Sequence, residues 1–131
     1  MPSDGLFIGL MSGTSMDGID AVLVHIADEQ TQVRRTHSQT FSPMLRSRVA
    51  ALATGEADSL DHLATLDRAL GLEFGQAANT LLSESGYKPE DIIAIGSHGQ
   101  TVRHHPHGPL EQRYSLQIGD PSSIAELTGI T

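Results

Sequence analysis

A run of glycines, hydroxyl side chains and carboxylates near the start of the chain is the segment best suited to chemistry. It extends from Gly9 to Asp20 with the sequence Gly-Leu-Met-Ser-Gly-Thr-Ser-Met-Asp-Gly-Ile-Asp. Glycine leaves room for a ligand and allows several backbone N–H groups to turn toward one point. Three hydroxyl side chains add further donors: Ser12, Thr14 and Ser15. Asp17 and Asp20 are suited to hold Mg²⁺ directly or through water, so the segment predicts a cradle for the phosphates of a nucleotide.

The same residues are also typical of an ordinary hairpin turn. Asp17-Gly18 lies between two apolar runs, which is a common hairpin signal. The segment is not a Walker loop, because no Gly-Lys-Ser/Thr follows, and it is not a GxGxxG fingerprint. It joins a strand to a strand, so no helix N-terminus is available to help bind an anion. From these residues alone, the simple turn and the phosphate cradle both stay open.

A second polar segment, Gly96 to Thr101, comes directly after a buried apolar run. In α/β sheets, ligand-binding loops lie at the carboxyl ends of strands. His98, Gln100 and Thr101 offer the mixed donors and acceptors that suit the hydroxyl groups of a sugar. A cluster of hydrogen bonds within a loop explains these residues equally well.

Histidines are concentrated in the segment that follows. Four of the seven in the chain are His98, His104, His105 and His107. Neutral imidazole suits zinc or nickel. Neighbouring residues of an exposed loop rarely point at one ion, however, and no regularly spaced acidic or cysteine ligands accompany them. A metal-binding module is therefore the least favoured hypothesis.

The overall composition limits the classes of partner. The 131 residues suffice for one domain, and 16 acidic residues against 8 basic ones give a formal net charge of −8. An acidic chain is poorly suited to nucleic acid or an anionic membrane. The absence of cysteine excludes disulfides and thiolate metal sites. With no signal peptide and no apolar stretch near the length of a membrane helix, we expect a cytoplasmic protein without nucleic-acid or membrane partners.

The apolar pattern predicts an α/β fold that positions both polar segments. The expected strands span residues 6–11, 19–26, 31–41, 91–96 and 114–118, with another beginning at 130. The expected helices span residues 43–54, 59–85 and 121–127, with Ser42 and Asp120 as N-caps of the first and third and with Gly55 and Gly86 ending the first two. A polar loop is expected over residues 97–112. Gly71 and Gly75 inside the long helix either weaken it or allow another element to pack closely.

Three segments taken together resemble one known family. They are Gly9–Asp20, Gly96–His104 (Gly-Ser-His-Gly-Gln-Thr-Val-Arg-His) and Leu116–Pro121 (Leu-Gln-Ile-Gly-Asp-Pro), and their order and spacing match as well. The resemblance is to anhydro-N-acetylmuramic acid kinase, and it runs through the whole chain. It implies the RNase H-like fold of actin-like ATPases and sugar kinases. In that fold a three-stranded antiparallel meander is followed by helices and parallel strands.

The resemblance also implies a reaction. A cytoplasmic enzyme of bacterial peptidoglycan recycling would use magnesium ATP and water to convert 1,6-anhydro-N-acetylmuramic acid into N-acetylmuramic acid 6-phosphate. Opening the 1,6-anhydro bridge requires a general base that delivers water to the anomeric carbon. The sugar oxygen O6 must then meet the γ-phosphate roughly in line.

Site residues follow from the same resemblance. The ATP phosphate loop would consist of Gly13, Thr14, Ser15, Met16, Asp17, Gly18, Ile19 and Asp20. Within it, Asp17 and Asp20 would hold Mg²⁺. His98, Gln100 and Thr101 would border the sugar pocket. The turn at Gly119-Asp120 either lines the cleft or serves only to cap the helix that follows.

The chain departs from this family in length. Such kinases are much longer and have two lobes, and the segment that carries their catalytic aspartate is expected beyond Thr131. Residues 1–131 would then be the N-terminal part of the first lobe, without a catalytic base, inactive alone and prone to self-association. The resemblance also allows a homodimer of the intact enzyme. The alternative is a catalytically silent ligand-binding or interaction domain of the same fold.

Overall fold

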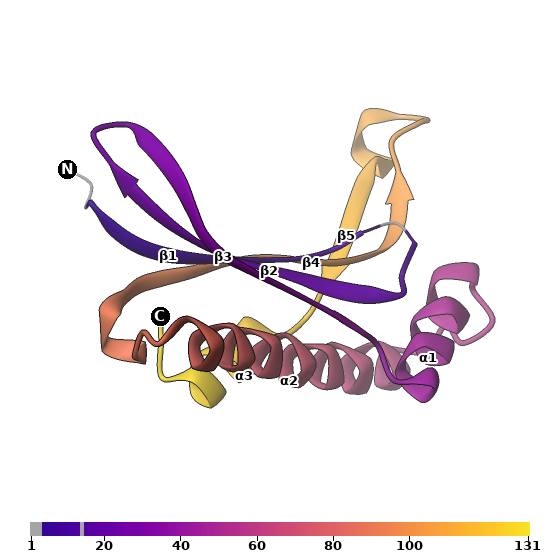
Figure 1. The fold of residues 1–131 in the computed structure, drawn as a ribbon. Helices are drawn as coiled ribbons and strands as arrows, with labels where there is room; N and C mark the ends of the chain where they lie inside the picture. Colours follow the sequence, from indigo (N-terminus) through magenta and orange to yellow (C-terminus); the bar gives the residue numbers. More distant parts are fainter. Residues whose placement is uncertain (1–3, 14) are drawn as a thin grey trace.

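In the part of the chain that the structure describes, one sheet of five strands with helices packed on it makes up the fold (Figure 1). The computed structural model describes residues 4–13 and 15–131. In chain order the elements are β1 (Gly5–Ser12), β2 (Gly18–Ala27), β3 (Gln30–Thr40), α1 (Pro43–Thr54), α2 (Leu60–Ser85), η1 (Pro89–Asp91), β4 (Ile92–His105), η2 (Leu110–Gln112), β5 (Tyr114–Ile118) and α3 (Pro121–Thr128). The predicted α/β class is confirmed.

The strand order in the sheet is β3-β2-β1-β4-β5. The first three strands form the predicted antiparallel meander, with β3 at the edge. After the two long helices, β4 pairs parallel to β1, while β5 returns antiparallel to β4. This order brings the end of β1 beside the middle of β4, so the two polar segments meet although they lie far apart in the sequence.

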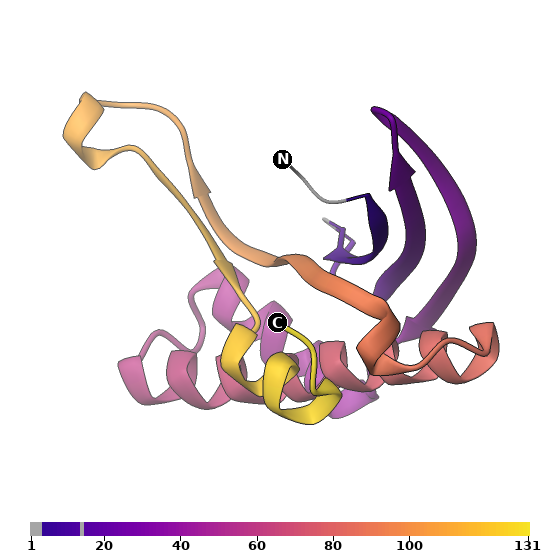
Figure 2. The same ribbon diagram turned by 90° about the vertical axis from the view of Figure 1, so that its left-hand side faces the viewer.

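The helices α1, α2 and α3 lie on one side of the sheet, as the two views of the ribbon show (Figures 1 and 2). Helix α2 supplies much of the core, because its apolar residues recur every three or four positions and all face one side. Its largest fully buried side chains are Leu66, Leu70, Phe74 and Leu81. They pack in one cluster with alternate residues of the strands, such as Ile8 and Leu23.

The helix boundaries predicted from capping residues are confirmed. Ser42 accepts a hydrogen bond from the Leu45 N–H at 3.3 Å, as expected of an N-cap. Ser59, expected as the first residue of the long helix, is its N-cap and accepts a hydrogen bond from the His62 N–H at 3.0 Å. Gly55 and Gly86 end the two long helices in the left-handed conformation. These are the terminal arrangements that satisfy the unpaired backbone groups of a helix.

Gly71 and Gly75 allow α3 to pack closely on α2, which decides between the two interpretations of these glycines. A Cβ on Gly71 would lie 2.6 Å from the Asp120 carbonyl oxygen. A Cβ on Gly75 would lie 2.8 Å from a methyl group of Leu127. Both distances are shorter than van der Waals contact, so any larger side chain would force the helices apart.

The polar loop expected over residues 97–112 is wrong over its first half, because β4 continues to His105. Residues Gln100 to His105 pair with β5 and form an antiparallel hairpin. Figure 2 shows that this hairpin projects beyond the helical layer. Much of the hairpin therefore buries no apolar face. Its sequence lacks the alternation of apolar and polar residues from which strands are usually predicted.

The last residues of the chain lie against β4. Ile130 is buried, and the Ile95 N–H donates to the Thr131 carbonyl at 2.8 Å. The structure assigns no strand to residues 130–131, where one was expected to begin: besides this bond, the Ile130 N–H donates to the Thr128 hydroxyl at 3.2 Å. Within the described part of the chain, no helix combines the length and hydropathy needed to cross a membrane.

Candidate phosphate-binding site

The turn between β1 and β2 is a compact loop closed at its base. The Ser12 hydroxyl lies 2.6 Å from the Gly18 carbonyl oxygen, which joins the end of β1 to the start of β2. Inside the loop, the Met16 N–H donates to the Gly13 carbonyl at 3.1 Å. Met16 has a left-handed backbone with φ of 56°, and its side chain packs partly on the core. The Met16 side chain thus anchors the loop.

A cleft of about 280 Å³ opens beside this loop. Its lining includes six of the eight residues predicted for the phosphate loop: Gly13, Ser15, Asp17, Gly18, Ile19 and Asp20. Met16 is turned away, and Thr14 lies outside the described residues. Ser12, predicted as a further donor to the ligand, is instead buried and bonded within the protein.

The opposite wall of the cleft comes from the end of β3 and was missed by the sequence analysis. It consists of Ser38, Gln39 and Thr40. The pairing of β2 with β3 sets Gly18 opposite Thr40 and Asp20 opposite Ser38. The signal that could have located these residues is this register, since an antiparallel partner of β2 must end beside the point where β2 begins.

Both acidic residues of the loop are exposed at the cleft and held by serine hydroxyls. The Ser15 hydroxyl donates to Asp17 at 2.8 Å, and the Ser38 hydroxyl donates to Asp20 at 2.6 Å. Among residues 4–13 and 15–131, no three His, Asp or Glu side chains converge as a metal site. Two carboxylates are nevertheless a suitable protein contribution for Mg²⁺, which usually takes its other ligands from phosphates and water. The residues present therefore fit this ion.

A neighbouring hollow extends the cleft toward helix α1. It shares Asp17 and Thr40 with the cleft and is lined further along by Arg46 and Ser47. Arg46 brings a permanent positive charge close to a loop that otherwise carries two carboxylates. A guanidinium in this place favours the approach of a polyphosphate.

The three residues predicted to border a sugar have different surroundings. Between Leu10 and Met11 of β1, the pairing partner in β4 jumps from Ser97 to Gly99, so His98 is the extra residue of a β-bulge. Bulges commonly re-aim side chains next to functional sites. His98 is exposed, whereas Thr101 is half-buried and accepts a hydrogen bond from Gln117 at 3.0 Å.

Gln100, by contrast, points inward and contacts the phosphate loop. Its side chain is completely buried. The Gln100 Oε1 lies 2.5 Å from the Ser12 hydroxyl, and its Nε2 donates to the Gly13 carbonyl at 3.2 Å. Of the three predicted sugar residues, Gln100 alone is hydrogen-bonded to the loop among the described contacts.

Two further histidines of the hairpin, His104 and His105, have separate partners. His104 lies 3.2 Å from the Ser115 hydroxyl, and the ring of His105 stacks on that of Tyr114 with centroids 5.7 Å apart. Both contacts connect β4 to β5. They give these side chains a structural role in the hairpin.

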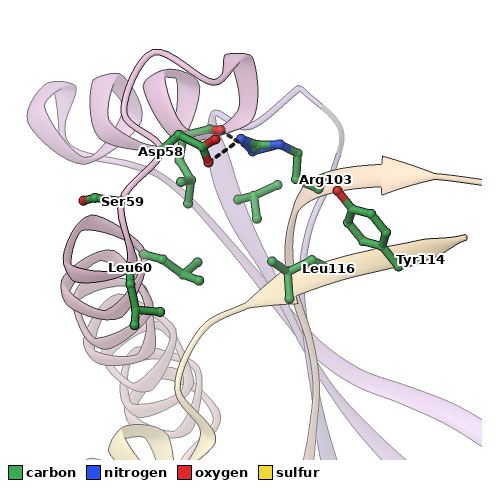
Figure 3. Close-up of a pocket in the computed structure, with 9 residues that line it drawn as sticks. Asp58, Ser59, Leu60, Arg103, Tyr114 and Leu116 are labelled. Atoms are coloured by element: carbon green, nitrogen blue, oxygen red, sulfur yellow. Dashed lines mark hydrogen bonds and ion pairs between the residues drawn. The ribbon is translucent and has the colours of Figure 1, made fainter. Parts of the chain in front are cut away.

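A second cleft of about 340 Å³ lies between the start of α2 and the β4–β5 hairpin (Figure 3). Its walls are mostly apolar, with Leu60, Leu116 and Tyr114 among them. Arg103 pairs with Asp58 at 2.9 Å and donates to the Leu52 carbonyl at 2.6 Å. The charges of this cleft are therefore already engaged within the protein, and it shares no lining residue with the cleft at the loop.

Asp120 serves as the N-cap of α3. It accepts hydrogen bonds from the Ser122 N–H at 3.1 Å and from the Ser123 hydroxyl at 2.5 Å. The Ser123 bond is the main reason that the pKa of Asp120 lies below its ordinary value of 3.8. Asp120 does not line the loop cleft, so capping accounts for this residue.

Comparison with known proteins agrees with the resemblance seen in the sequence. Residues 5–131 match the family model described as anhydro-N-acetylmuramic acid kinase. The anhydro-N-acetylmuramic acid kinase of Shewanella sp. (strain ANA-3) is 52% identical over 124 residues, which cover 95% of this chain and 33% of that protein. The protein of the same name from Shewanella woodyi is 48% identical over 128 residues, covering 98% and 34%. The chain thus spans about a third of the length of these relatives. Its sequence matches this family over nearly all of its residues, and the chain belongs to the anhydro-N-acetylmuramic acid kinase family.

Proposed function

We propose that this chain is the ATP phosphate-binding part of an anhydro-N-acetylmuramic acid kinase and forms the N-terminal part of its first lobe. The observation that carries the proposal is the cleft beside the β1–β2 turn, which six residues of the expected phosphate loop line together. Glycine at positions 13 and 18 keeps the loop side of the cleft free of bulk. In this proposal the ATP phosphates lie along Gly13 to Asp20, with Thr14 included on the resemblance alone.

Asp17 and Asp20 are proposed to hold the Mg²⁺ that accompanies ATP. Bound there, Mg²⁺ would neutralise phosphate charge as the γ-phosphoryl group is transferred. The two serine hydroxyls that donate to these carboxylates support the assignment, because they restrict each carboxylate to one orientation. Arg46 in the adjoining hollow adds the positive charge that a polyphosphate needs.

The sugar is proposed to lie beside the β4 segment that carries His98, Gln100 and Thr101. The bulge at His98 supports this, because it turns an exposed imidazole outward next to the strand that ends at the phosphate loop. A sugar held there would have its O6 oxygen near the phosphates, as in-line transfer requires. The general base that activates water is proposed to come from residues outside positions 1–131.

The substrates in this proposal are 1,6-anhydro-N-acetylmuramic acid, water and ATP, and the products are N-acetylmuramic acid 6-phosphate and ADP. The setting is cytoplasmic peptidoglycan recycling. A homodimer of the intact enzyme belongs to the proposal on the family resemblance alone.

A chimera tests the proposed function. This chain would replace the matching third of the Shewanella sp. (strain ANA-3) relative, and ADP release would be measured with magnesium ATP, with and without the anhydro-sugar. We expect sugar-dependent ADP release by the chimera and none by the 131-residue chain alone. A folded chimera without sugar-dependent release would contradict the proposed function. Sugar-dependent release by the chain alone would show that a base lies within it.

A further inference from the structure

Gln100 is completely buried, yet its amide is directed at the backbone of a loop that is otherwise open to solvent. Its Nε2 donates to the Gly13 carbonyl at 3.2 Å and to the Thr101 carbonyl at 3.0 Å. Both partners are carbonyl oxygens, so the amide orientation is fixed with nitrogen on this side. The oxygen of the amide then faces Ser12, whose hydroxyl lies 2.5 Å away.

The Gly13 carbonyl is held by two donors at once. Besides Gln100, the Met16 N–H donates to it at 3.1 Å. A backbone carbonyl that points into an anion site repels the anion, whereas N–H groups that point there attract it. Neither Gln100 nor Met16 lines the cleft that Gly13 borders, so both donors engage this carbonyl within the protein.

We infer that Gln100 is a positioning residue for the phosphate loop, which acts by fixing the direction of the Gly13 carbonyl. This inference rests on the proposed binding of phosphate at the loop. It gives Gln100 a role different from direct sugar contact, since its side chain exposes no surface to a ligand. In a regular strand His98 and Gln100, two residues apart, would face the same side of the sheet. The bulge at His98 breaks this alternation, so that His98 is exposed while Gln100 is buried, and one strand serves both subsites.

Ser12 connects the Gln100 amide to the other end of the phosphate loop. Its hydroxyl carries one proton and lies near two acceptors, the Gly18 carbonyl at 2.6 Å and the Gln100 Oε1 at 2.5 Å. Ser12 is buried. The hydroxyl therefore connects Gln100 to the far end of the loop, so that both ends of the loop depend on the same amide.

The test is binding of magnesium tripolyphosphate to the ¹⁵N,¹³C-labelled chain, followed by NMR. Gln100→Met keeps the size of the side chain and removes every hydrogen bond. Gln100→Glu keeps the acceptor for Ser12 and removes the donor to Gly13. The matched control is Gln117→Met, since the Gln117 amide also bonds within the sheet, to Thr101 and Ser115.

We expect both Gln100 variants to bind tripolyphosphate about tenfold more weakly, and the Gln117 variant to bind like the wild type. The carbonyl ¹³C shift of Gly13 should change in the Gln100 variants alone. Burial raises the pKa of a carboxyl group, so Gln100→Glu should regain affinity on acidification as its O–H becomes a donor to Gly13. The wild-type pH profile corrects for protonation of the phosphate.

The outcomes separate the inference from the function it rests on. If the wild type binds tripolyphosphate at the loop and either folded Gln100 variant binds equally well, the inference is overturned. If the wild type itself shows no binding at the loop, the proposed function fails and the inference fails with it. Should Gln100→Met not fold, Gln100→Glu and its recovery at low pH decide the question alone.

Discussion

The Ser38 hydroxyl on β3 donates a hydrogen bond to the Asp20 carboxylate on β2 at 2.6 Å, across the strand pair that walls the phosphate cleft. This contact fixes one carboxylate oxygen from the opposite wall. The proposed metal ligand is thus oriented by a residue that lies outside the loop motif. The edge strand β3, polar along most of its length, thereby contributes to the site.

Asp20→Asn should abolish the effect of Mg²⁺ on tripolyphosphate binding. In the presence of Mg²⁺ we expect affinity to fall roughly tenfold, because a charged ligand group is lost. Without Mg²⁺ the variant should bind no more weakly than the wild type, since one repulsive charge is gone. Titration calorimetry with and without Mg²⁺ measures both quantities.

Asp28→Asn is the matched control for this prediction. Asp28 lies in the turn at the opposite end of the β2–β3 hairpin, with φ of 51°, a conformation that asparagine also tolerates. Equal losses of Mg²⁺ dependence in both variants would mean that net charge, and no specific site, governs binding.

Gly13 and Gly18 should respond differently to a methyl group. Nothing lies within 4 Å of a Cβ on Gly13, whereas a Cβ on Gly18 would overlap the Gln39 carbonyl oxygen. Gly13→Ala should therefore keep the thermal stability of the chain and weaken tripolyphosphate binding, because its methyl group occupies ligand space. Gly18→Ala should lower stability by about 1–3 kcal/mol, as overpacking does.

Thermal melts and binding titrations of both alanine variants check this prediction. Unchanged phosphate affinity in a folded Gly13→Ala chain would be evidence that the ligand does not approach this part of the loop.

Arg46 should contribute to phosphate affinity through its charge. Arg46→Gln is expected to weaken tripolyphosphate binding by about fivefold at low salt, near 1 kcal/mol, and by less at high salt. Arg48→Gln is the control, because the Arg48 guanidinium donates instead to Thr65 on α2 at 3.0 Å. An equal effect of both substitutions would refute a specific role for the hollow beside α1.

Asp120 should stabilise the fold above the acid range. Its pKa is lowered mainly by the Ser123 hydroxyl, so the charged form is favoured in the folded state. The stabilisation is complete above the unfolded pKa and is lost as pH falls through the lower folded pKa. Asp120→Ala should cost about 1 kcal/mol at neutral pH, as loss of an N-cap does.

Denaturant unfolding at several pH values measures the difference in free energy of unfolding between the wild type and Asp120→Ala. The difference should begin to narrow near the ordinary pKa of an aspartate, about 3.9, and should be lost once the pH has fallen below the lowered pKa of folded Asp120. Glu126→Ala, an exposed position on the same helix, serves as the control. A difference between wild type and Asp120→Ala that is independent of pH would show that the charge of the cap has no part in it.

Local signals in the sequence predicted much of this fold. The capping residues Ser42 and Asp120 located two of the helix starts, because their side chains satisfy backbone groups within three residues. The meander followed from apolar runs on either side of a glycine-rich turn. Such signals depend only on near neighbours, so one sequence is enough to find them.

The features that were missed depend on contacts between distant segments. The second half of β4 is a strand because β5 pairs with it, and its polar residues give no period of their own. The wall formed by Ser38, Gln39 and Thr40 depends on the register of β3 against β2. The inward direction of Gln100 depends on the bulge at His98, which nothing in the local sequence indicates.

The most direct test of the account is a ¹⁵N–¹H NMR titration of the wild-type chain with magnesium ATP. We predict amide shift changes at Gly13, Ser15, Gly18, Asp20 and the end of β3, and no comparable changes at Arg103 or Tyr114 in the cleft of Figure 3. Shifts centred on that second cleft, or no saturable shifts at the loop, would contradict the claim that the β1–β2 turn binds the phosphates.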